Sequence, residues 1–415
     1  MKIAIFSDCY LDLIGGIVST INTEKAALEQ RGHTVEIFSS AYPHSASEIK
    51  KLAKENIFPV PSCKHIGIGL TPIARRPKII ERWLLQNHPE IKDYDIYYIH
   101  YEAGCSIAGL RLARQFNIPA VQVMHGREDA GEEKLIPSGL RTIVATLLNW
   151  FHSWYLPHET KVHRDNYLAN TIARAKMWTL MVNHANYADL IITPSEHFKK
   201  KLTHYGVKKP IIALHHGIKD ALIETKISPR TIDENEPLRI IWHSRISGEK
   251  RPMVFLEAIK ILHQDFKKTN YRVDVYGDGL DFKRAQKYAK KHHLNVIFYG
   301  AKPFNEIWQE IIKAHLDILV SYDSDTFGMT LIEAAAAGTP SLFVDKDMCE
   351  ILPKDSYLMA DGPAPDQIAS ALASYLEHPE KYVAMTKLLR EYREKLKISH
   401  KIDQLEQLFT SLMVK

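Results

Sequence analysis

The chain has 415 residues, a length that supports two or three hydrophobic cores of ordinary size. Its apolar fraction of 45% and charged fraction of 25% are typical of a globular enzyme and exclude a disordered or fibrous chain. The net charge of +5 is small for this length, so bulk charge gives no support to nucleic-acid binding.

The cysteines and the apolar segments indicate the compartment. The four cysteines are scattered without a close pair, which argues against a disulfide framework and a thiolate zinc site. We therefore expect a cytoplasmic protein. The apolar run at residues 3–6 is too short for a signal peptide. Because no apolar run approaches the roughly 18 residues that span a bilayer, we expect any membrane contact to be peripheral, at the cytoplasmic face.

In the first half of the chain, β-rich runs alternate with helical stretches, the pattern of a parallel sheet covered by helices. Residues 2–7 are predicted to form a buried strand, residues 16–30 a helix, and residues 34–38 a second strand. Further strands are predicted at residues 95–99, 120–124, 190–193 and 211–214. Periodicity does not place the long region from 131 to 183. The pattern predicts one Rossmann-like domain over residues 1–218.

A mostly polar stretch at residues 219–237 is interpreted as the linker to a second domain. After it the alternation begins again. Strands are predicted at residues 239–243, 272–276, 295–299, 317–320 and 341–344, and helices at 252–264, 281–292 and 305–314. Only helical periodicity remains after residue 365. We predict a second Rossmann-like domain over residues 219–397, followed by a helix at about residues 398–415 that crosses back onto the first domain.

The most informative motif follows the strand at residues 317–320. A short polar loop with Gly328 leads into an Ala-rich helix, so the amides at the start of that helix face the space beyond the strand. Such amides suit an anion. Asp325 in the loop and Glu333 on the helix are eight positions apart and can flank a ligand that carries both hydroxyl groups and phosphate.

Arg245 and Lys250 follow the strand at residues 239–243 and place two cations at the edge where ligands bind in open α/β sheets. They suit a diphosphate, although each alone is also typical of a solvated surface. Gly277 and Gly300 end two further strands, where a plain tight turn is the alternative interpretation.

Two further candidates lie in the first half of the chain. Gly15 and Gly16 join the first strand to the first helix, where glycine lets the backbone approach a phosphate or sugar closely. A turn that only needs small residues is the alternative. His125 ends the strand at residues 120–124 and therefore lies at the ligand edge, unless it is a core histidine.

These motifs resemble retaining glycosyltransferases of the family 4 type, which have the GT-B fold, and most closely the diacylglycerol glucosyltransferase and phosphatidylinositol mannosyltransferase branch. The resemblance implies an α/β fold of two Rossmann-like domains that face each other across a cleft. It further implies that the residue at Asp325 holds sugar hydroxyls and that Glu333 holds the nucleotide ribose. The chain departs from the family pattern at Asp325, where glutamate is usual, and at Ser244, where glycine is usual.

The resemblance also implies the roles of the remaining residues. Those expected in catalysis are His125, Arg245, Lys250 and Asp325. Those expected to bind the donor are Gly15, Gly16, Gly277, Gly300, Phe327, Gly328, Met329, Thr330 and Glu333. The donor is a nucleotide diphosphate sugar, with a UDP-sugar favoured, and neither a cofactor nor a metal is expected. Since the leaving phosphate accepts the proton in this family, neither Glu128 nor Asp129 is assigned as a base.

The acceptor is less well defined by the sequence. Residues 75–85 mix cations with apolar side chains, and residues 147–156 contain Trp150, Phe151, Trp154 and Tyr155. Basic and aromatic segments of this kind are typical of an anionic membrane surface and equally of helices packed on their own domain. We expect a hexosyltransferase whose acceptor is a membrane glycerolipid such as diacylglycerol. A transferase of the same fold that acts on a soluble or polymer-linked glycan is one alternative, and a non-catalytic subunit that binds sugar nucleotides is another.

Overall fold

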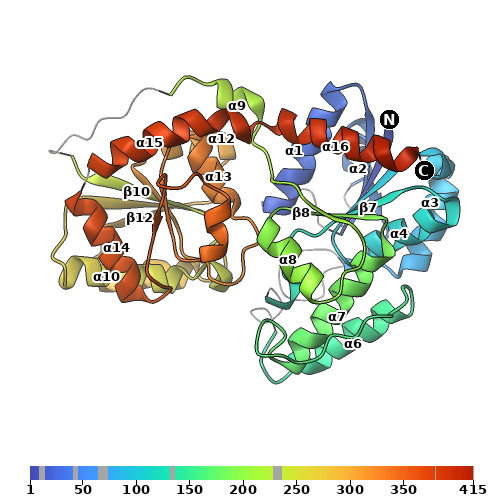
Figure 1. The fold of residues 1–415 in the computed structure, drawn as a ribbon, viewed down its shortest axis with the longest axis horizontal. Coiled ribbons are helices and arrows are strands. Elements are labelled where there is room, and N and C mark those ends of the chain that lie inside the picture. The colour runs from blue at the N-terminus through green and yellow to red at the C-terminus, as the bar shows by residue number, and fades with distance from the viewer. Residues whose placement is uncertain are drawn as a thin grey trace. The chain divides into compact units, whose positions relative to one another are not determined.

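The computed structural model describes residues 1–8, 15–40, 45–63, 73–130, 136–227, 236–378 and 380–414. It divides into two compact units (Figure 1). The first unit contains Met1–His215 and Lys401–Lys415, and the second contains His216–His400. Each unit has one parallel sheet with helices on its faces, which confirms the predicted α/β class.

The sheet of the first unit has seven parallel strands in the order β3-β2-β1-β6-β7-β8-β9. Their bounds are β1 (Lys2–Ser7), β2 (Thr34–Ser40), β3 (Ile57–Val60), β6 (Ile96–His100), β7 (Ala120–Val123), β8 (Leu190–Thr193) and β9 (Ile211–Ala213). A two-stranded ribbon is formed by β4 (Ser62–Cys63) and β5 (Ile73–Ala74). All strands predicted in this half are confirmed to within two residues. We did not predict β3, an edge strand that contains Pro59.

Helices cover the first sheet. Their bounds are α1 (Gly16–Gln30), α2 (Ala46–Lys54), α3 (Pro77–Asn87), α4 (Gly104–Phe116), α6 (Arg141–Ser153), α7 (Ile172–Tyr187) and α8 (Glu196–His204), and the 3₁₀ helix η1 (Pro89–Asp93) follows α3. The region that periodicity left unplaced contains α6 and most of α7, which pack side by side (Figure 1). Because α7 is buried on nearly all sides, its sequence has no amphipathic period.

The sheet of the second unit has six parallel strands in the order β12-β11-β10-β13-β14-β15. Their bounds are β10 (Leu238–His243), β11 (Tyr271–Tyr276), β12 (Val296–Gly300), β13 (Leu316–Leu319), β14 (Ser341–Phe343) and β15 (Leu358–Met359). All the predicted strands are confirmed to within one residue at each end, and only the two-residue β15 was not predicted. Alternate residues of β10 face opposite cores: Trp242 packs with residues of α10 and α14, and Ile241 with residues of α12 and α13.

Helices cover this sheet on both faces (Figure 1). Their bounds are α10 (Pro252–Gln264), α11 (Phe282–Lys291), α12 (Phe304–Lys313), α13 (Met329–Ala336), α14 (Pro365–Glu377) and α15 (Glu380–Tyr392), with the 3₁₀ helices η2 (Gly248–Lys250), η3 (Lys346–Glu350) and η4 (Arg393–Leu396). The stretch that we interpreted as a linker contains a short helix, α9 (Asp220–Glu224), and its residues 228–235 lie outside the described part of the chain. No helix of the described residues has the length and apolar character needed to cross a membrane.

The last helix, α16 (Ile398–Met413), begins at the residue where we predicted it. From Lys401 onward its residues group with the first unit. Lys401 Nζ lies 2.5 Å from a carboxylate oxygen of Glu24 on α1, and both side chains are buried. Nearer to the surface, Arg31 lies 2.6 Å from Asp403. A buried ion pair together with the packing of Phe409 on Tyr98 therefore holds α16 in this unit.

Candidate active site

In the second sheet the strand order reverses between β10 and β13, and ligands bind beyond the carboxyl ends of strands at such a reversal. Lys250 follows β10 in η2, and Asp325 lies between β13 and α13. Lys250 Nζ is 2.8 Å from each carboxylate oxygen of Asp325, with both side chains largely buried. The fold thus brings together two residues that are 75 positions apart, as an ion pair that an incoming donor would have to share or open.

Arg245 lies on the loop after β10, and its side chain is 65% exposed. One guanidinium nitrogen is 3.3 Å from a carboxylate oxygen of Glu249, which also accepts a hydrogen bond from the Ser247 hydroxyl. The cation is therefore tethered only at its own loop. It is free to reorient toward an anion at the strand ends.

The start of α13 is shaped by Gly328, whose φ of +68° lies in the left-handed region. A Cβ at this position would lie 3.0 Å from Leu319 and 3.2 Å from Leu331, so a larger residue would be both strained and crowded. No side chain caps the helix here, and the first amides of a helix have no partners within it. These amides can accept an anion such as a phosphate group.

Three other predicted residues surround this helix start. Phe327 is buried, and its ring meets the ring of His216 edge to face at 5.0 Å. Met329 and Thr330 form the first turn and are partly buried. The Thr330 hydroxyl is buried without a hydrogen-bond partner among the described residues, so a bound ligand is one group that could satisfy it.

The two predicted glycine turns contact each other and the loop of Arg245. The Gly277 amide donates to the Gly300 carbonyl over 2.9 Å. Gly277 has a φ of +129°, and a Cβ there would lie 2.1 Å from the Ser244 carbonyl oxygen, so only glycine fits. Gly300 has a φ of +73° and open space around it. The loops after β10, β11 and β12 therefore form one packed rim.

His243, the last residue of β10, was not predicted as a site residue. Its buried imidazole lies between two carboxylates, with Nδ1 3.1 Å from Asp317 and Nε2 3.2 Å from Glu333. The contact angles do not fit hydrogen bonds, so these are ion pairs. Burial alone would lower the pKa of His243, but Asp317 and Glu333 together raise it to about 10. A charged imidazole thus holds Glu333, which the sequence predicts to bind ribose.

The remaining predicted residues lie in the first unit. Gly15 precedes α1 with an extended backbone, φ −174°, and a Cβ there would meet no atom within 4 Å. Gly16 is the first residue of α1. Glycine is therefore not needed for the backbone conformation at Gly15, and it leaves open space before the helix. Residues 9–14, which precede Gly15, lie outside the described part.

His125 lies just beyond β7, and its Nε2 is 2.8 Å from Nδ1 of His100, the last residue of β6. Burial, and then the positive charge of Lys401, lower the pKa of His125 to about 3. Burial likewise lowers the pKa of His100 well below its usual value. Sequence reasoning missed His100, because only the pairing of β6 with β7 places the two rings together.

Carboxylates also gather at these strand ends. Asp129 is buried in an ion pair with Arg127, at 2.8 Å. Burial raises the pKa of Glu128 to about 7, even though the Tyr101 hydroxyl donates to it. Burial, and then the charge of Glu128, raise the pKa of Glu102. Burial at this edge therefore favours the neutral forms of Glu102 and Glu128.

Among the described residues, one group of histidine and carboxylate side chains lies close enough together to hold a metal ion, and it contains none of the predicted site residues. The group is Glu36, His88 and Glu90 in the first unit.

Comparison with known proteins identifies the family. Residues 14–222 match the family described as Glycosyltransferase Family 4, and residues 223–392 match Glycosyl transferases group 1. The chain belongs to this family of glycosyltransferases. It is therefore a retaining enzyme that uses nucleotide sugars, as predicted from the resemblance.

Two similar relatives are alpha-monoglucosyldiacylglycerol synthases. The protein from Streptococcus pneumoniae is 25% identical over 362 residues, which cover 82% of this chain and 70% of the relative. The protein from Acholeplasma laidlawii is 23% identical over 374 residues, which cover 86% of this chain and 83% of the relative. Among solved structures, HepE of Anabaena in complex with UDP has a TM-score of 0.68 at 14% identity, covering 99% of this chain and all of that chain. At this identity the likeness concerns the fold, and it confirms the predicted GT-B type.

Proposed function

We propose that this glycosyltransferase moves a hexose from a UDP-sugar to the free hydroxyl group of a membrane glycerolipid, with retention of configuration. Two relatives named as diacylglycerol-lipid synthases support the lipid acceptor. A neighbour solved with UDP supports the choice of nucleotide. The observation that carries the lipid assignment is an exposed apolar face on α6.

This apolar face, which we call the α6 row, has members three or four positions apart and therefore lies on one side of the helix. Its members, each about half exposed, are Leu140, Ile143, Leu147, Trp150 and Trp154. The rings of Trp150 and Trp154 meet edge to face, with centroids 4.2 Å apart. Since α6 buries Ala145 and His152 on its other side, the α6 row is left over from packing. Apolar side chains with tryptophan suit the interface of a membrane.

Cations lie next to one end of the α6 row. Arg76, Lys78 and Ile79, at the start of α3, line a hollow of about 490 Å³ together with Trp154 and Tyr155. Exposed cations beside an apolar face are attracted to anionic lipid head groups. The basic segment at residues 75–85 and the aromatic segment at residues 147–156 thus meet at one hollow of the first unit, which favours the lipid interpretation over simple packing.

The donor part of the proposal rests on the second unit. Lys250, Arg245 and the first amides of α13 would stabilise the negative charge that develops on the departing diphosphate. Asp325 would hold hydroxyl groups of the sugar, and Glu333 would hold the ribose. Because charge stabilisation would be supplied by cations and amides of the chain, this arrangement requires no metal at the donor.

The test compares acceptors and a surface variant. Purified chain is given a panel of nucleotide sugars with vesicles of diacylglycerol and anionic phospholipid, or with soluble sugars, and the products are analysed. We expect glycolipid from vesicles and a UDP-sugar. Replacing Trp150 and Trp154 together by serine should reduce turnover on vesicles about tenfold or more, since each buried tryptophan contributes a few kcal/mol of apolar transfer. Binding of UDP should not change.

Phe266→Ser, at a 40%-exposed aromatic of the second unit, is the matched control and should behave as the unchanged protein. Turnover with soluble sugars alone would defeat the lipid acceptor. Absence of both transfer and donor hydrolysis under all conditions would instead favour the non-catalytic subunit.

A further inference from the structure

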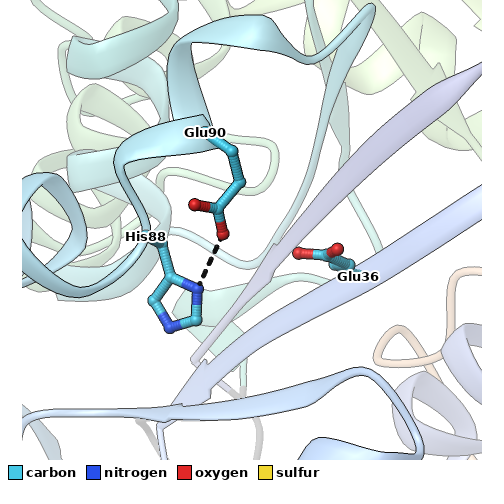
Figure 2. Close-up of side chains that lie close together, drawn as sticks. All are labelled: Glu36, His88 and Glu90. Atoms are coloured by element: carbon cyan, nitrogen blue, oxygen red, sulfur yellow. Dashed lines mark hydrogen bonds and ion pairs between the residues drawn. The ribbon is translucent and has the colours of Figure 1, made fainter.

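Three side chains of the first unit converge at a place where the transfer reaction has no role for them (Figure 2). Glu36 lies in the first half of β2, His88 directly follows α3, and Glu90 belongs to η1. One ligand atom from each lies within 4.8 Å of the others. His88 Nδ1 is 3.2 Å from Glu90 Oε1, and Figure 2 shows the Glu36 carboxylate pointing toward the same space.

The imidazole of His88 is held in place by aromatic rings. The ring of Phe58 meets it at 4.5 Å, that of Phe38 at 5.1 Å and that of Trp83 at 5.2 Å, measured between centroids. Its side chain is only 12% exposed. The rings therefore restrict the orientation of the imidazole.

The Glu36 carboxylate is oriented by Tyr94, whose hydroxyl donates a hydrogen bond to Oε2. No Lys or Arg of the described residues forms an ion pair with either carboxylate. Glu90 is in contact with the imidazole and Glu36 lies beside it, so two carboxylates flank one imidazole at a place that suits a cation.

The chain contains a second copy of the local part of this group, which serves as an internal comparison. The sequence His-Pro-Glu occurs at residues 88–90 and again at 378–380. His378 follows α14 with φ −126° and ψ 60°, close to the φ −135° and ψ 63° of His88 after α3. Its Nδ1 is also 3.2 Å from the carboxylate of Glu380.

The two-residue spacing in the sequence therefore explains the contact between histidine and glutamate in both places. It does not explain why a third side chain, Glu36, lies beside His88. The pair at 378 and 380 is mostly exposed, with side chains 50% and 69% accessible, and no third ligand of the described residues joins it. Only at His88 does a strand bring in another carboxylate, Glu36.

We propose that Glu36, His88 and Glu90 bind one divalent transition-metal ion with the ligand preferences of Zn²⁺. One imidazole nitrogen and two carboxylate oxygens are ligands that Zn²⁺ accepts, and three protein ligands leave a position for water. In tetrahedral coordination each ligand atom lies about 2.1 Å from the metal ion, which places the ligand atoms roughly 3.4 Å from one another. The long glutamate side chains must therefore turn inward when the ion binds. The ion would join β2 to the end of α3 and would thereby stabilise the folded first unit.

The test uses the full chain, stripped with a chelator and then titrated with Zn²⁺ alone against a competing indicator. The competitor is needed because the chain has 21 histidines, which offer weak background sites. We expect one tight site per chain and a higher melting temperature with Zn²⁺. Co²⁺ should give visible absorption bands when it occupies the same site. Glu36→Gln should weaken the tight site at least about tenfold.

Glu380→Gln is the matched control, because it removes the same carboxylate from the second His-Pro-Glu sequence. It should leave Zn²⁺ binding and the Co²⁺ spectrum unchanged. Equal binding by Glu36→Gln and the unchanged chain, or an equal loss in Glu380→Gln, would overturn the proposal. So would the lack of any stoichiometric site for Zn²⁺. If Glu36→Gln does not fold, Glu90→Gln takes its place.

Discussion

The carboxyl ends of the strands differ in charge between the two units. In the second unit they carry ionised pairs, with Lys250 beside Asp325 and a charged His243 between Asp317 and Glu333. In the first unit, beside the buried Arg127–Asp129 pair, burial shifts several groups toward their neutral forms. The pKa of His125 is lowered to about 3, and the pKa of Glu128 is raised to about 7.

The two histidines show how neighbours decide this difference. Both lie at the carboxyl end of a parallel strand and both are buried, so solvent exclusion lowers the pKa of each. His243 faces two carboxylates, which reverse the effect, whereas His125 faces Lys401, whose positive charge reinforces it. A charged rim suits a diphosphate donor, and a neutral rim suits the hydroxyl group of an acceptor. The predictions below break this contrast one group at a time.

The largest effect is expected for Lys250→Ala. It removes a cation proposed to face the leaving diphosphate, so kcat should fall by about 10²- to 10³-fold. Circular dichroism should show an intact fold, since the lysine is not part of a hydrophobic core. The control is Lys313→Ala, which removes an exposed lysine paired with Glu310 on the same unit and should leave kcat unchanged. Near-normal turnover by Lys250→Ala would refute the assignment.

A smaller effect is expected for His243→Gln. Without the imidazolium, Glu333 loses the cation that positions it, and the affinity for UDP should fall roughly tenfold, the value of one hydrogen bond to a charged group. Calorimetric titration with UDP measures this. His315→Gln is the control. His315 lies just before β13, at the amino ends of the strands and away from the candidate site, and its Nδ1 accepts a hydrogen bond from the Arg239 amide.

The same variant can be tested with UDP that lacks a ribose hydroxyl. If His243 acts through Glu333 on the ribose, the variant and the unchanged protein should bind 2′-deoxy or 3′-deoxy UDP with similar affinity. A loss that stays tenfold with both deoxy ligands would mean that His243 only supports the fold of the strand end. Its pKa of about 10 predicts that tight binding of UDP persists up to that pH and is lost above it.

The smallest effect is expected for Glu128→Gln. The pKa of Glu128 is raised from 4.5 to about 7, so the folded protein holds a proton that the unfolded chain releases between these values. Its contribution to stability is present below pH 4.5 and is lost as the pH rises through 7. The variant should therefore melt a few degrees above the unchanged protein at pH 8, with the difference vanishing near pH 4.5. A difference that does not depend on pH would contradict this account.

Much of the fold could be predicted from the sequence because parallel strands buried on both faces are continuous apolar runs. The loops of Arg245, Gly277 and Gly328 could be placed for the same reason, since each directly follows such a run. The exceptions are local: β3 contains Pro59, and α7 has no polar face. In both cases the sequence lacks the pattern of apolar and polar residues by which a strand or a helix is usually recognised.

The contacts within the candidate site could not be predicted, because they depend on which strands become neighbours. Nothing near His243 in the sequence indicates that Asp317 and Glu333 will flank it. The same holds for Glu36, which meets His88 only when β2 and the end of α3 pack together. The sequence does show histidines at the ends of apolar strands. That pattern identified His125 as a candidate site residue, but it did not indicate the charge state of the imidazole.

Asp8 has a consequence for the choice of acceptor. Its carboxylate accepts hydrogen bonds from the amides of Cys105 and Ser106 and from the Ser106 hydroxyl, at the start of α4. The helix end that could otherwise attract a phosphate is thereby already bonded to a carboxyl group of the chain. A phosphorylated head group would find these amides occupied, so we expect the start of α4 to offer it no site.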